Sequence, residues 1–359
     1  DGLSWTFRLD EGLVFHNGDS LTAEDVKFSL ERTMFHEESV VGDGRRLKKQ
    51  LRQPPEEAIE VIDPLTVRLH TEGSKPHFWS LLTRAVFQGG QIMPKNYIEA
   101  MGDEGFRAKP VGSGPWRYVD HSVGDFFEYE AFDKSLRGVP HFQKLSLLLV
   151  PEESTKIAMV RTGQADIIDL VPESAPEVLG AGMKLTVIEG VGMFIFQFWG
   201  LYFDEAKDLP TTDVRVRQAM SLAINRQDII DFTMNGYARP SMPFATFPTS
   251  VDVDVPRWQK WAKETLIYDP DRARELLKEA GWENGFDLTY WSTNFGGTPY
   301  MNDISQAVAG FWDEIGINVD LKVVERGIWT PMTRKKGNTN WDQGMNGDVS
   351  IYRNAGRPL

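Results

Sequence analysis

The stretch from Ser4 to Met34 constrains the fold of this chain more than any other, because a strand, a turn and a capped helix follow one another in it. Apolar and polar residues alternate from Trp5 to Asp10, which is the period of a half-buried strand. Asn17-Gly18-Asp19 predicts a turn, and Thr22 predicts a helix N-cap followed by acidic residues in the first turn. Three apolar residues at spacings of four then predict one buried helix face: Val26, Leu30 and Met34. An α/β structure is therefore expected at the N-terminal end.

The last third of the chain predicts a second α/β structure. Asp269 to Gly281 has an Asp cap, Pro at the first helical position and a terminating Gly, which together predict a helix. Phe286 to Trp291 predicts a strand, Pro299 to Ile315 a helix, and Ile317 to Val324 the next strand. A strand–helix–strand unit of this length predicts a parallel pair with a right-handed crossover.

Five segments resemble one protein family, the family 5 extracellular solute-binding proteins, which are the peptide- and nickel-type receptors of ABC importers. They are WTFRLDEGLVFHNGDSLTAEDVKFSLER, VGSGPW, RTGQADIIDLVP, DVRVRQAMSLAINRQDII and YDPDRARELLKEAGW. The resemblance implies an α/β class II periplasmic-binding-protein fold, with two lobes, a cleft between the lobes and a small α/β insertion at about residues 21–110. An arbitrary α/β unit would fit the opening motif alone. The apolar run from Ala165 to Leu170 within the third segment is expected to be a strand.

The length of 359 residues also favours two lobes, because it exceeds the usual size of one domain. We expect the first lobe at residues 1–195 and the second at 196–359, joined through the apolar run Val187 to Tyr202, which favours a central strand crossing between the lobes. Family members begin before the equivalent of Trp5 and continue past the equivalent of Leu359. The second lobe is therefore expected to be incomplete at its C-terminal end.

The composition narrows the classes of partner. The formal net charge of −13 argues against nucleic acid or an anionic membrane as the main partner. The chain has no cysteine, which excludes disulfides, zinc–thiolate sites and thiol nucleophiles. The resemblance implies a monomer without a cofactor that hands its solute to the transmembrane subunits of an ABC permease. It implies a periplasmic location, or an extracellular, membrane-tethered one in a Gram-positive source.

Motifs of the common enzyme classes are missing from the sequence. HExxH, GxSxG, SxxK and the phosphate-binding GxxxxGK[ST] do not occur. Paired carboxylates such as Asp166 and Asp169, or Asp252 and Asp254, are in principle compatible with a glycosidase, but their spacings are more typical of exposed strand or loop positions. We therefore expect a non-enzymatic solute receptor, with a carboxylate-dependent hydrolase and a chaperone-like peptide holder as the rival classes.

Candidate ligand-binding residues come from three segments: Phe198, Trp199 and Tyr202; Arg84 and Gln88; and Asp348 and Arg353. The three aromatic residues are placed at a cleft wall, with core packing as the alternative. Arg84 and Gln88 lie in a glycine-bearing loop that, by resemblance, faces the cleft. Asp348 stands near the place where peptide-binding relatives carry an acidic partner for the ligand's amine, and Arg353 suits a ligand carboxylate. Oligopeptide is the expected ligand class, narrowly ahead of an opine-like or other carboxylated solute, or an oligosaccharide.

Overall fold

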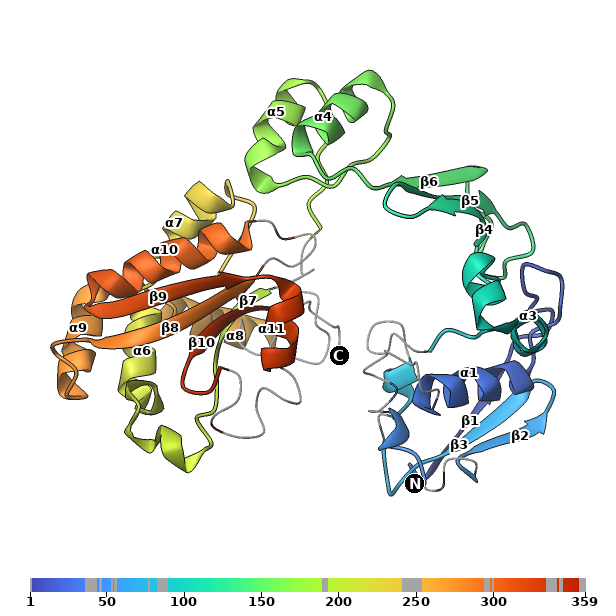
Figure 1. Cartoon of the computed structure of the whole chain (residues 1–359), viewed down its shortest axis with the longest axis horizontal. Coiled ribbons are helices and arrows are strands. Elements are labelled where there is room, and N and C mark those ends of the chain that lie inside the picture. The colour runs from blue at the N-terminus through green and yellow to red at the C-terminus, as the bar shows by residue number, and fades with distance from the viewer. Residues whose placement is uncertain are drawn as a thin grey trace. The chain divides into compact units, whose positions relative to one another are not determined.

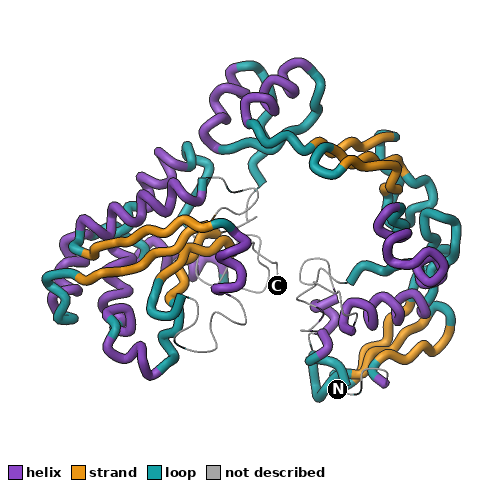
Figure 2. Tube along the Cα trace, in the orientation of Figure 1, coloured by secondary structure: helices purple, strands orange, loops and turns teal. Residues whose placement is uncertain are grey.

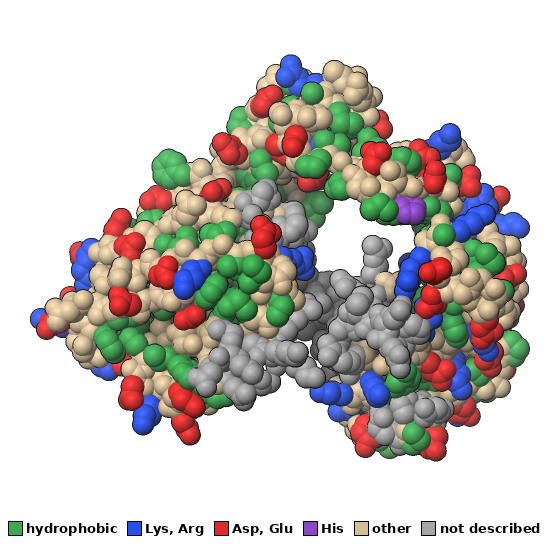
Figure 3. All heavy atoms as spheres, viewed as in Figure 1, with side chains coloured by type: hydrophobic (Ala, Val, Ile, Leu, Met, Phe, Trp, Pro, Cys, Tyr) green, Lys and Arg blue, Asp and Glu red, His purple; other side chains and the backbone are tan. Residues whose placement is uncertain are grey.

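The computed structural model describes residues 2–35, 44, 47–52, 54, 57–76, 78–82, 90–188, 193–240, 254–293, 298, 300–333, 341 and 345–354. The chain divides into two units, one reaching Pro151 and the other beginning at Glu152, and each is described separately (Figure 1). The sequence-based boundary near residue 195 stays a prediction. Acidic and basic side chains are interspersed over the visible surface of each unit (Figure 3).

The first unit opens with a three-stranded antiparallel sheet in the order β1-β3-β2, formed by β1 (Ser4–Arg8), β2 (Ile59–Asp63) and β3 (Thr66–His70). Helix α1 (Ala23–Phe35) packs on it through the predicted apolar face. The Asp25 carboxylate accepts hydrogen bonds from both the backbone N–H and the hydroxyl of Thr22, at 2.9 Å each. This contact from the third helical residue back to Thr22, the residue just before the helix, confirms the predicted helix start.

A second sheet completes the first unit. Its strands β4 (Trp116–Ser122), β5 (Phe126–Ala131) and β6 (Lys144–Leu148) are antiparallel in the order β4-β5-β6. A short 3₁₀ helix, η2 (Phe78–Leu82), and helix α3 (Lys95–Ala108) precede them. The His16 ring joins the loop after β1 to the turn before β4: its Nε2 bonds the Gly114 carbonyl at 2.9 Å, and its Nδ1 accepts from the Gly112 N–H at 3.3 Å.

The second unit is built on a four-stranded sheet in the order β7-β10-β8-β9. The strands are β7 (Met193–Phe198), β8 (Phe286–Thr293), β9 (Ile317–Val324) and β10 (Val349–Asn354). Strands β8, β9 and β10 are parallel, while β7 runs antiparallel to β10. Helix α10 (Met301–Glu314) connects β8 to β9, so the predicted strand–helix–strand unit is confirmed. Figure 2 shows the strands of this sheet as one orange layer with helices beside it.

One face of this sheet carries the largest apolar core. Helices α6 (Val214–Leu222), α9 (Pro270–Glu279) and α10 contribute to this core with the inward residues of the strands. Trp312 of α10 is fully buried, and its indole N–H donates to the Met220 carbonyl of α6 at 2.9 Å. At the start of β8, Gly285 has φ +76° and lies against the Gly316 carbonyl, where no Cβ would fit. The glycine therefore permits the close approach of the β8 and β9 strand starts.

The remaining helices are short: α4 (Glu153–Thr162), η3 (Pro172–Ser174), α5 (Ala175–Gly180), η4 (Asp204–Asp208), η5 (Pro210–Thr212), α7 (Arg226–Asp228), η6 (Ile229–Thr233), α8 (Val255–Thr265) and α11 (Arg326–Thr333). The strand predicted from Ala165 to Leu170 is wrong, because this segment is not extended in a sheet and Ile167 is 90% exposed. The run Val187–Tyr202 does contain a strand, β7, but β7 is an edge strand in the described part of the sheet. Among all the residues that the structure describes, no helix combines the length and apolarity that a bilayer span requires.

Candidate functional site

The order of the strands marks one end of the second-unit sheet as the expected ligand position. From β8 the chain moves to β9 on one side, and from β9 it returns to β10 on the other side of β8. The order therefore reverses between β8 and β10. In open α/β sheets, ligands bind outside the carboxyl ends of the strands at such a reversal. The carboxyl ends of β8 and β10 are Thr293 and Asn354, while the pairing of Ser350 with Trp291 lies on the face of the sheet, two residues before the end of β8 and at the start of β10.

A hydrogen bond between Trp291 and Asp348 bridges the reversal point. The Trp291 indole N–H donates to Asp348 Oδ2 at 2.6 Å. Burial raises the pKa of the Asp348 carboxyl, as does the nearby Asp320, while the Trp291 hydrogen bond and the positive charge of Lys322 oppose the shift. The Lys322 ammonium lies 5.2 Å from the centre of a Trp291 ring and 3.4 Å from Asp320 Oδ2. Aromatic and charged groups of β8, of β9 and of Asp348, the residue just before β10, are thus held together.

Strand register extends this arrangement into a row across the sheet. Ser350 is opposite Gln197 on one side and Trp291 on the other, and Trp291 is opposite Lys322. Residues opposite one another in a sheet project from the same face. One row of four side chains therefore crosses the face of the sheet opposite the large core.

Trp199 lies beside Ser350, near the β7 end of this row. Its indole N–H donates to Ser350 Oγ at 2.8 Å, and its backbone N–H donates to the Asp348 carbonyl at 3.0 Å. Trp199 is 8% exposed and packs in a small cluster with Trp329 and Met345. Its largest contribution is therefore to hold the start of β10, and the backbone of Asp348, against the end of β7.

Hydroxyl groups gather at the carboxyl end of β8. Ser305 Oγ donates to Ser292 Oγ at 2.8 Å, and Ser292 Oγ donates to Asn302 Oδ1 at 2.9 Å. The hydroxyl oxygen of Thr293, the last residue of β8, is buried and makes no hydrogen bond within the described structure. A buried hydroxyl without a partner costs free energy, so this end of the strand has capacity for one more polar contact.

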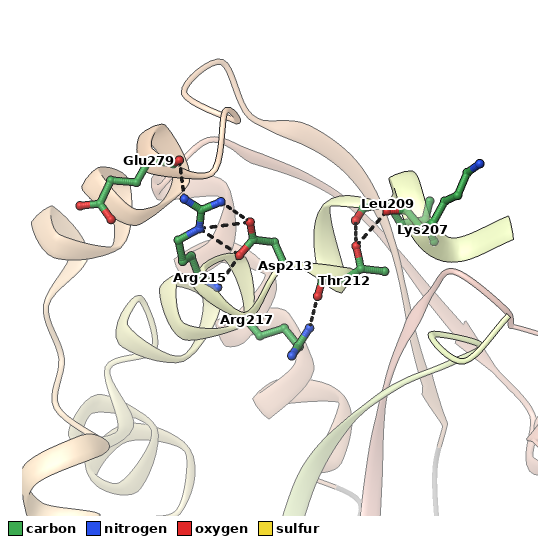
Figure 4. A network of polar contacts seen from close by, with 7 residues as sticks. All are labelled: Lys207, Leu209, Thr212, Asp213, Arg215, Arg217 and Glu279. Carbon is green, nitrogen blue, oxygen red and sulfur yellow. Dashed lines mark hydrogen bonds and ion pairs between the residues drawn. The ribbon is translucent and has the colours of Figure 1, made fainter. Parts of the chain in front are cut away.

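A pocket of about 470 Å³ lies along β7 in the second unit and shares Gln197 with the row. Its lining consists of Phe196, Gln197, Phe198, Leu201, Thr212 and Arg217. The Arg217 guanidinium comes from the first turns of α6, and its Nη1 donates to the Thr211 and Thr212 carbonyls at 2.7 and 2.8 Å (Figure 4). The neighbouring Arg215 instead binds Asp213, which caps α6, and the Glu279 carbonyl. Arg215 is therefore part of the helix cap, whereas Arg217 lines the pocket.

Groups that could hold a metal ion do not converge in the described residues. No three His, Asp or Glu side chains there are placed to hold a metal ion. Asp348 is the carboxyl whose pKa burial raises, and its Oδ2 is engaged by an indole. At the strand reversal, Ser350 is fully buried and Trp291 packs against the buried Trp199, Trp329 and Met345, so Lys322 is the exposed member of the row.

Comparison with known proteins gives the family. The model for bacterial extracellular solute-binding proteins, family 5 middle, matches residues 1–356. The chain belongs to this family. The sequence-based resemblance and the class II periplasmic-binding-protein fold class are confirmed.

Individual relatives of this family 5 chain differ in their described ligands. The glutathione-binding protein GsiB of Pectobacterium atrosepticum is 28% identical over 343 residues, which cover 94% of this chain and 61% of that protein. The oligopeptide-binding protein AppA of Bacillus subtilis, solved with a nonapeptide, has a TM-score of 0.67 at 20% identity, covering 100% of this chain and 69% of AppA. AgaA of A. tumefaciens R10, solved with agropinic acid, has a TM-score of 0.72 at 22% identity, covering 100% of this chain and 66% of AgaA. The family 5 chain thus spans about three fifths of its glutathione-binding relative.

The structure brings together two of the predicted site residues, Trp199 and Asp348. Phe198 is half-buried, packs against the large core and lines the β7 pocket. Tyr202 is 71% exposed and contacts Phe203. Arg353 lies in β10 opposite Phe194.

Two predicted residues, Arg84 and Gln88, lie outside the described residues. The assignment of all seven residues to a ligand site stays a prediction.

Sequence reasoning missed all four residues of the row in the family 5 chain: Gln197, Ser350, Trp291 and Lys322. Trp291 ends the strand predicted at Phe286 to Trp291, so the rule that ligands bind at strand carboxyl ends was sufficient to select it. Ser350 carries no such signal, because its place depends on the pairing of β10 between β7 and β8.

Proposed function

We propose that this chain is the solute-binding receptor of an ABC importer, working in the periplasm or at the extracellular face of a membrane. It captures a small solute and delivers it unchanged to the transmembrane permease subunits. The observation that supports this proposal most directly is the row of Gln197, Ser350, Trp291 and Lys322 at the strand reversal of a family 5 chain. Gln197, Trp291 and Lys322 retain accessible surface, Ser350 is buried beneath Trp199, and none of the four is paired with a partner that would activate a nucleophile.

The proposed solute is a short peptide with a free carboxylate. The described ligands of the similar proteins are glutathione, a nonapeptide and agropinic acid. Each of these molecules carries at least one carboxylate, and the first two are peptides. Lys322 supports a carboxylated ligand, because an ammonium has three donors and one described ion pair, with Asp320. Trp291 holds the Lys322 ammonium over its ring and packs against Trp199, Trp329 and Met345, which fixes the position of the ammonium.

The roles proposed for Asp348 and Arg353 differ. Asp348 has one carboxylate oxygen bonded to Trp291, which leaves Oδ1 as the acceptor for a peptide amine. Arg353 belongs to β10 and is proposed to pair with the ligand carboxylate through two parallel hydrogen bonds. An opine-like acid would use the same arginine but would depend less on Asp348.

Titration calorimetry tests the proposal with reduced glutathione, a nonapeptide, agropinic acid and a neutral oligosaccharide as separate ligands, followed by mass spectrometry of the recovered ligand. We expect tight binding of one carboxylated peptide, recovered intact. Arg353→Ala should weaken that binding by at least about tenfold, since truncating one partner of a buried charged pair costs roughly 2–5 kcal/mol. Trp199→Ala should weaken every ligand, because the start of β10 loses its anchor.

Arg257→Ala is the matched control, since this exposed arginine of α8 contributes the same charge far along the chain from β10. Turnover of the ligand beyond one equivalent, abolished by a single Asp or Glu substitution, would favour a hydrolase and overturn the receptor. Broad, weak binding of every peptide without preference would favour a chaperone-like holder. Parent-like affinity in both Arg353→Ala and Trp199→Ala would remove the site assignment and leave the family unaffected.

A further inference from the structure

The carboxylates of Asp320 and Asp348 lie near the strand reversal in different surroundings. The Asp320 side chain on β9 is 66% exposed and pairs with Lys322 at 3.4 Å. The Asp348 side chain is half-buried, and its Oδ2 atom accepts the Trp291 indole N–H at 2.6 Å. Burial disfavours the charged form of a carboxyl, so the ionisation of Asp348 depends on what lies beside it.

Neighbours on β8 and β9 act on Asp348 in opposite directions. Burial has the largest effect and raises the pKa of the Asp348 carboxyl. The Trp291 hydrogen bond and the positive charge of Lys322 lower this pKa, while the negative charge of Asp320 raises it. The Trp199 backbone, which donates to the Asp348 carbonyl from the end of β7, adds no charge. The net change in pKa is upward, so Asp348 without solute takes up a proton at a higher pH than an ordinary aspartate does.

A positive charge placed beside Asp348 removes this proton. In the proposed function, Asp348 Oδ1 accepts the amine of a short peptide while Oδ2 stays on the Trp291 indole. An ammonium within about 4–6 Å favours the ionised form of a carboxyl and lowers its pKa. The pKa of Asp348 is then lower in the complex than in the chain without solute. A group whose pKa falls on binding releases its proton as the ligand binds.

We propose that binding of an amine-bearing solute at the strand reversal is coupled to release of a proton from Asp348, so that acid weakens capture of the solute. This inference rests on the proposed function, because it requires the amine of the solute to reach Asp348. Affinity is highest where Asp348 is ionised before the solute arrives. It falls as the pH decreases through the pKa that Asp348 has in the chain without solute. Because that pKa lies above 3.8, the loss begins at a higher pH than an ordinary aspartate would give.

The neighbours of Asp348 set the pH at which this loss of affinity begins. Trp291→Phe removes the hydrogen bond that opposes the upward shift in pKa, so the loss should begin at a higher pH than in the parent. Asp320→Asn removes the negative charge that supports the shift, so the loss should begin at a lower pH. A general loss of stability would weaken binding in both variants without moving their pH profiles in opposite directions.

Titration calorimetry of the whole 359-residue chain tests the coupling with reduced glutathione and a nonapeptide as probes. Measurement in two buffers that differ in heat of ionisation gives the number of protons exchanged on binding. A carboxyl whose pKa exceeds 3.8 is more than half protonated at that pH. At about pH 3.8 we therefore expect release of about half a proton or more, and about a twofold or greater loss of affinity relative to about pH 7.5. N-acetylated probes, which keep their carboxylates and lack the ammonium, should show neither effect.

Asp348→Asn should remove the proton release and the added loss in acid, while Asp271→Asn, the same change at an exposed residue of α9, should retain both. The proton count in the unaltered chain does not depend on how well any variant folds. Failure of both free-amine probes to bind at any pH would overturn the proposed function, and this inference with it. Tight binding without proton exchange, or profiles of Trp291→Phe and Asp320→Asn displaced in the same direction, would overturn this inference alone.

Discussion

Replacing Trp291 with Phe removes one hydrogen bond and retains most of the aromatic surface, so it isolates the contact that bridges the strand reversal. The lost bond is the 2.6 Å contact from the indole to Asp348 Oδ2. A hydrogen bond to a charged group contributes about 1.5–3 kcal/mol to folding. Asp348 retains partial contact with solvent, which lowers the figure to about 1.5 kcal/mol. We expect this loss of unfolding free energy at neutral pH.

The loss should depend on pH in a defined direction. Burial raises the folded-state pKa of Asp348 above its ordinary value of 3.8, so the folded chain takes up this proton more readily than the unfolded chain. Stability from this group is then greatest at low pH and falls as the pH rises from 3.8 through the folded-state pKa. The Trp291 hydrogen bond opposes the shift, so its removal raises that pKa further. The variant should therefore be nearer to the parent at about pH 4 than at about pH 7.

Urea unfolding followed by circular dichroism at the two pH values measures both effects. Trp261→Phe is the matched control, because the same change at a residue that is 37% exposed and bonded to no carboxylate should cost little at either pH. A double-mutant cycle with Asp348→Asn should return a coupling free energy of about 1 kcal/mol at neutral pH. An equal loss at both pH values, or a coupling of zero, would refute the assignment of the loss to this bond.

The elements of the second unit could be predicted because each one carries its own local signals. Helix α9 has an Asp cap that accepts from the Arg272 N–H at 2.9 Å, a proline at its start and a buried stripe. Helix α10 connects β8 to β9. A connection long enough to hold a helix allows two successive strands to run parallel, as β8 and β9 do. Periodicity and capping act within a few residues, so a single sequence reveals them.

The incorrect strand at Ala165 to Leu170 shows where local signals stop. Its apolar residues fit a buried strand, yet Ile167 is 90% exposed and no neighbouring strand pairs with the segment among the described residues. A strand is stabilised by its neighbours, and a short apolar run does not reveal whether a neighbour exists. Lys156 of the preceding helix contacts the exposed Asp169 carboxylate at 3.2 Å.

The candidate site was harder to predict than the fold because it depends on strand order. Trp199 and Asp348 are far apart in the sequence, and they meet because β10 inserts between β7 and β8. Trp291 becomes the partner of Asp348 through the same insertion. Strand order is a property of tertiary packing, and neither hydrophobic period nor turn chemistry encodes it.

Two further predictions concern the Asp213 helix cap and the two hydrogen bonds by which His16 joins the loop after β1 to the turn before β4. Asp213→Ala should destabilise α6 by about 0.5–2 kcal/mol in urea unfolding, because the carboxylate accepts the Arg215 N–H at 2.8 Å. His16 should make the stability of the first unit fall in acid. Its Nδ1 must be unprotonated to accept the Gly112 N–H while its Nε2–H donates to Gly114, and burial lowers its pKa below 6.5. A lowered histidine pKa gives stability that is present above 6.5 and is lost as the pH falls through the folded-state pKa. The thermal midpoint of the parent should therefore fall more steeply than that of His16→Gln between about pH 7.5 and about pH 5.5, and parallel profiles would contradict the role of this ring as the joint.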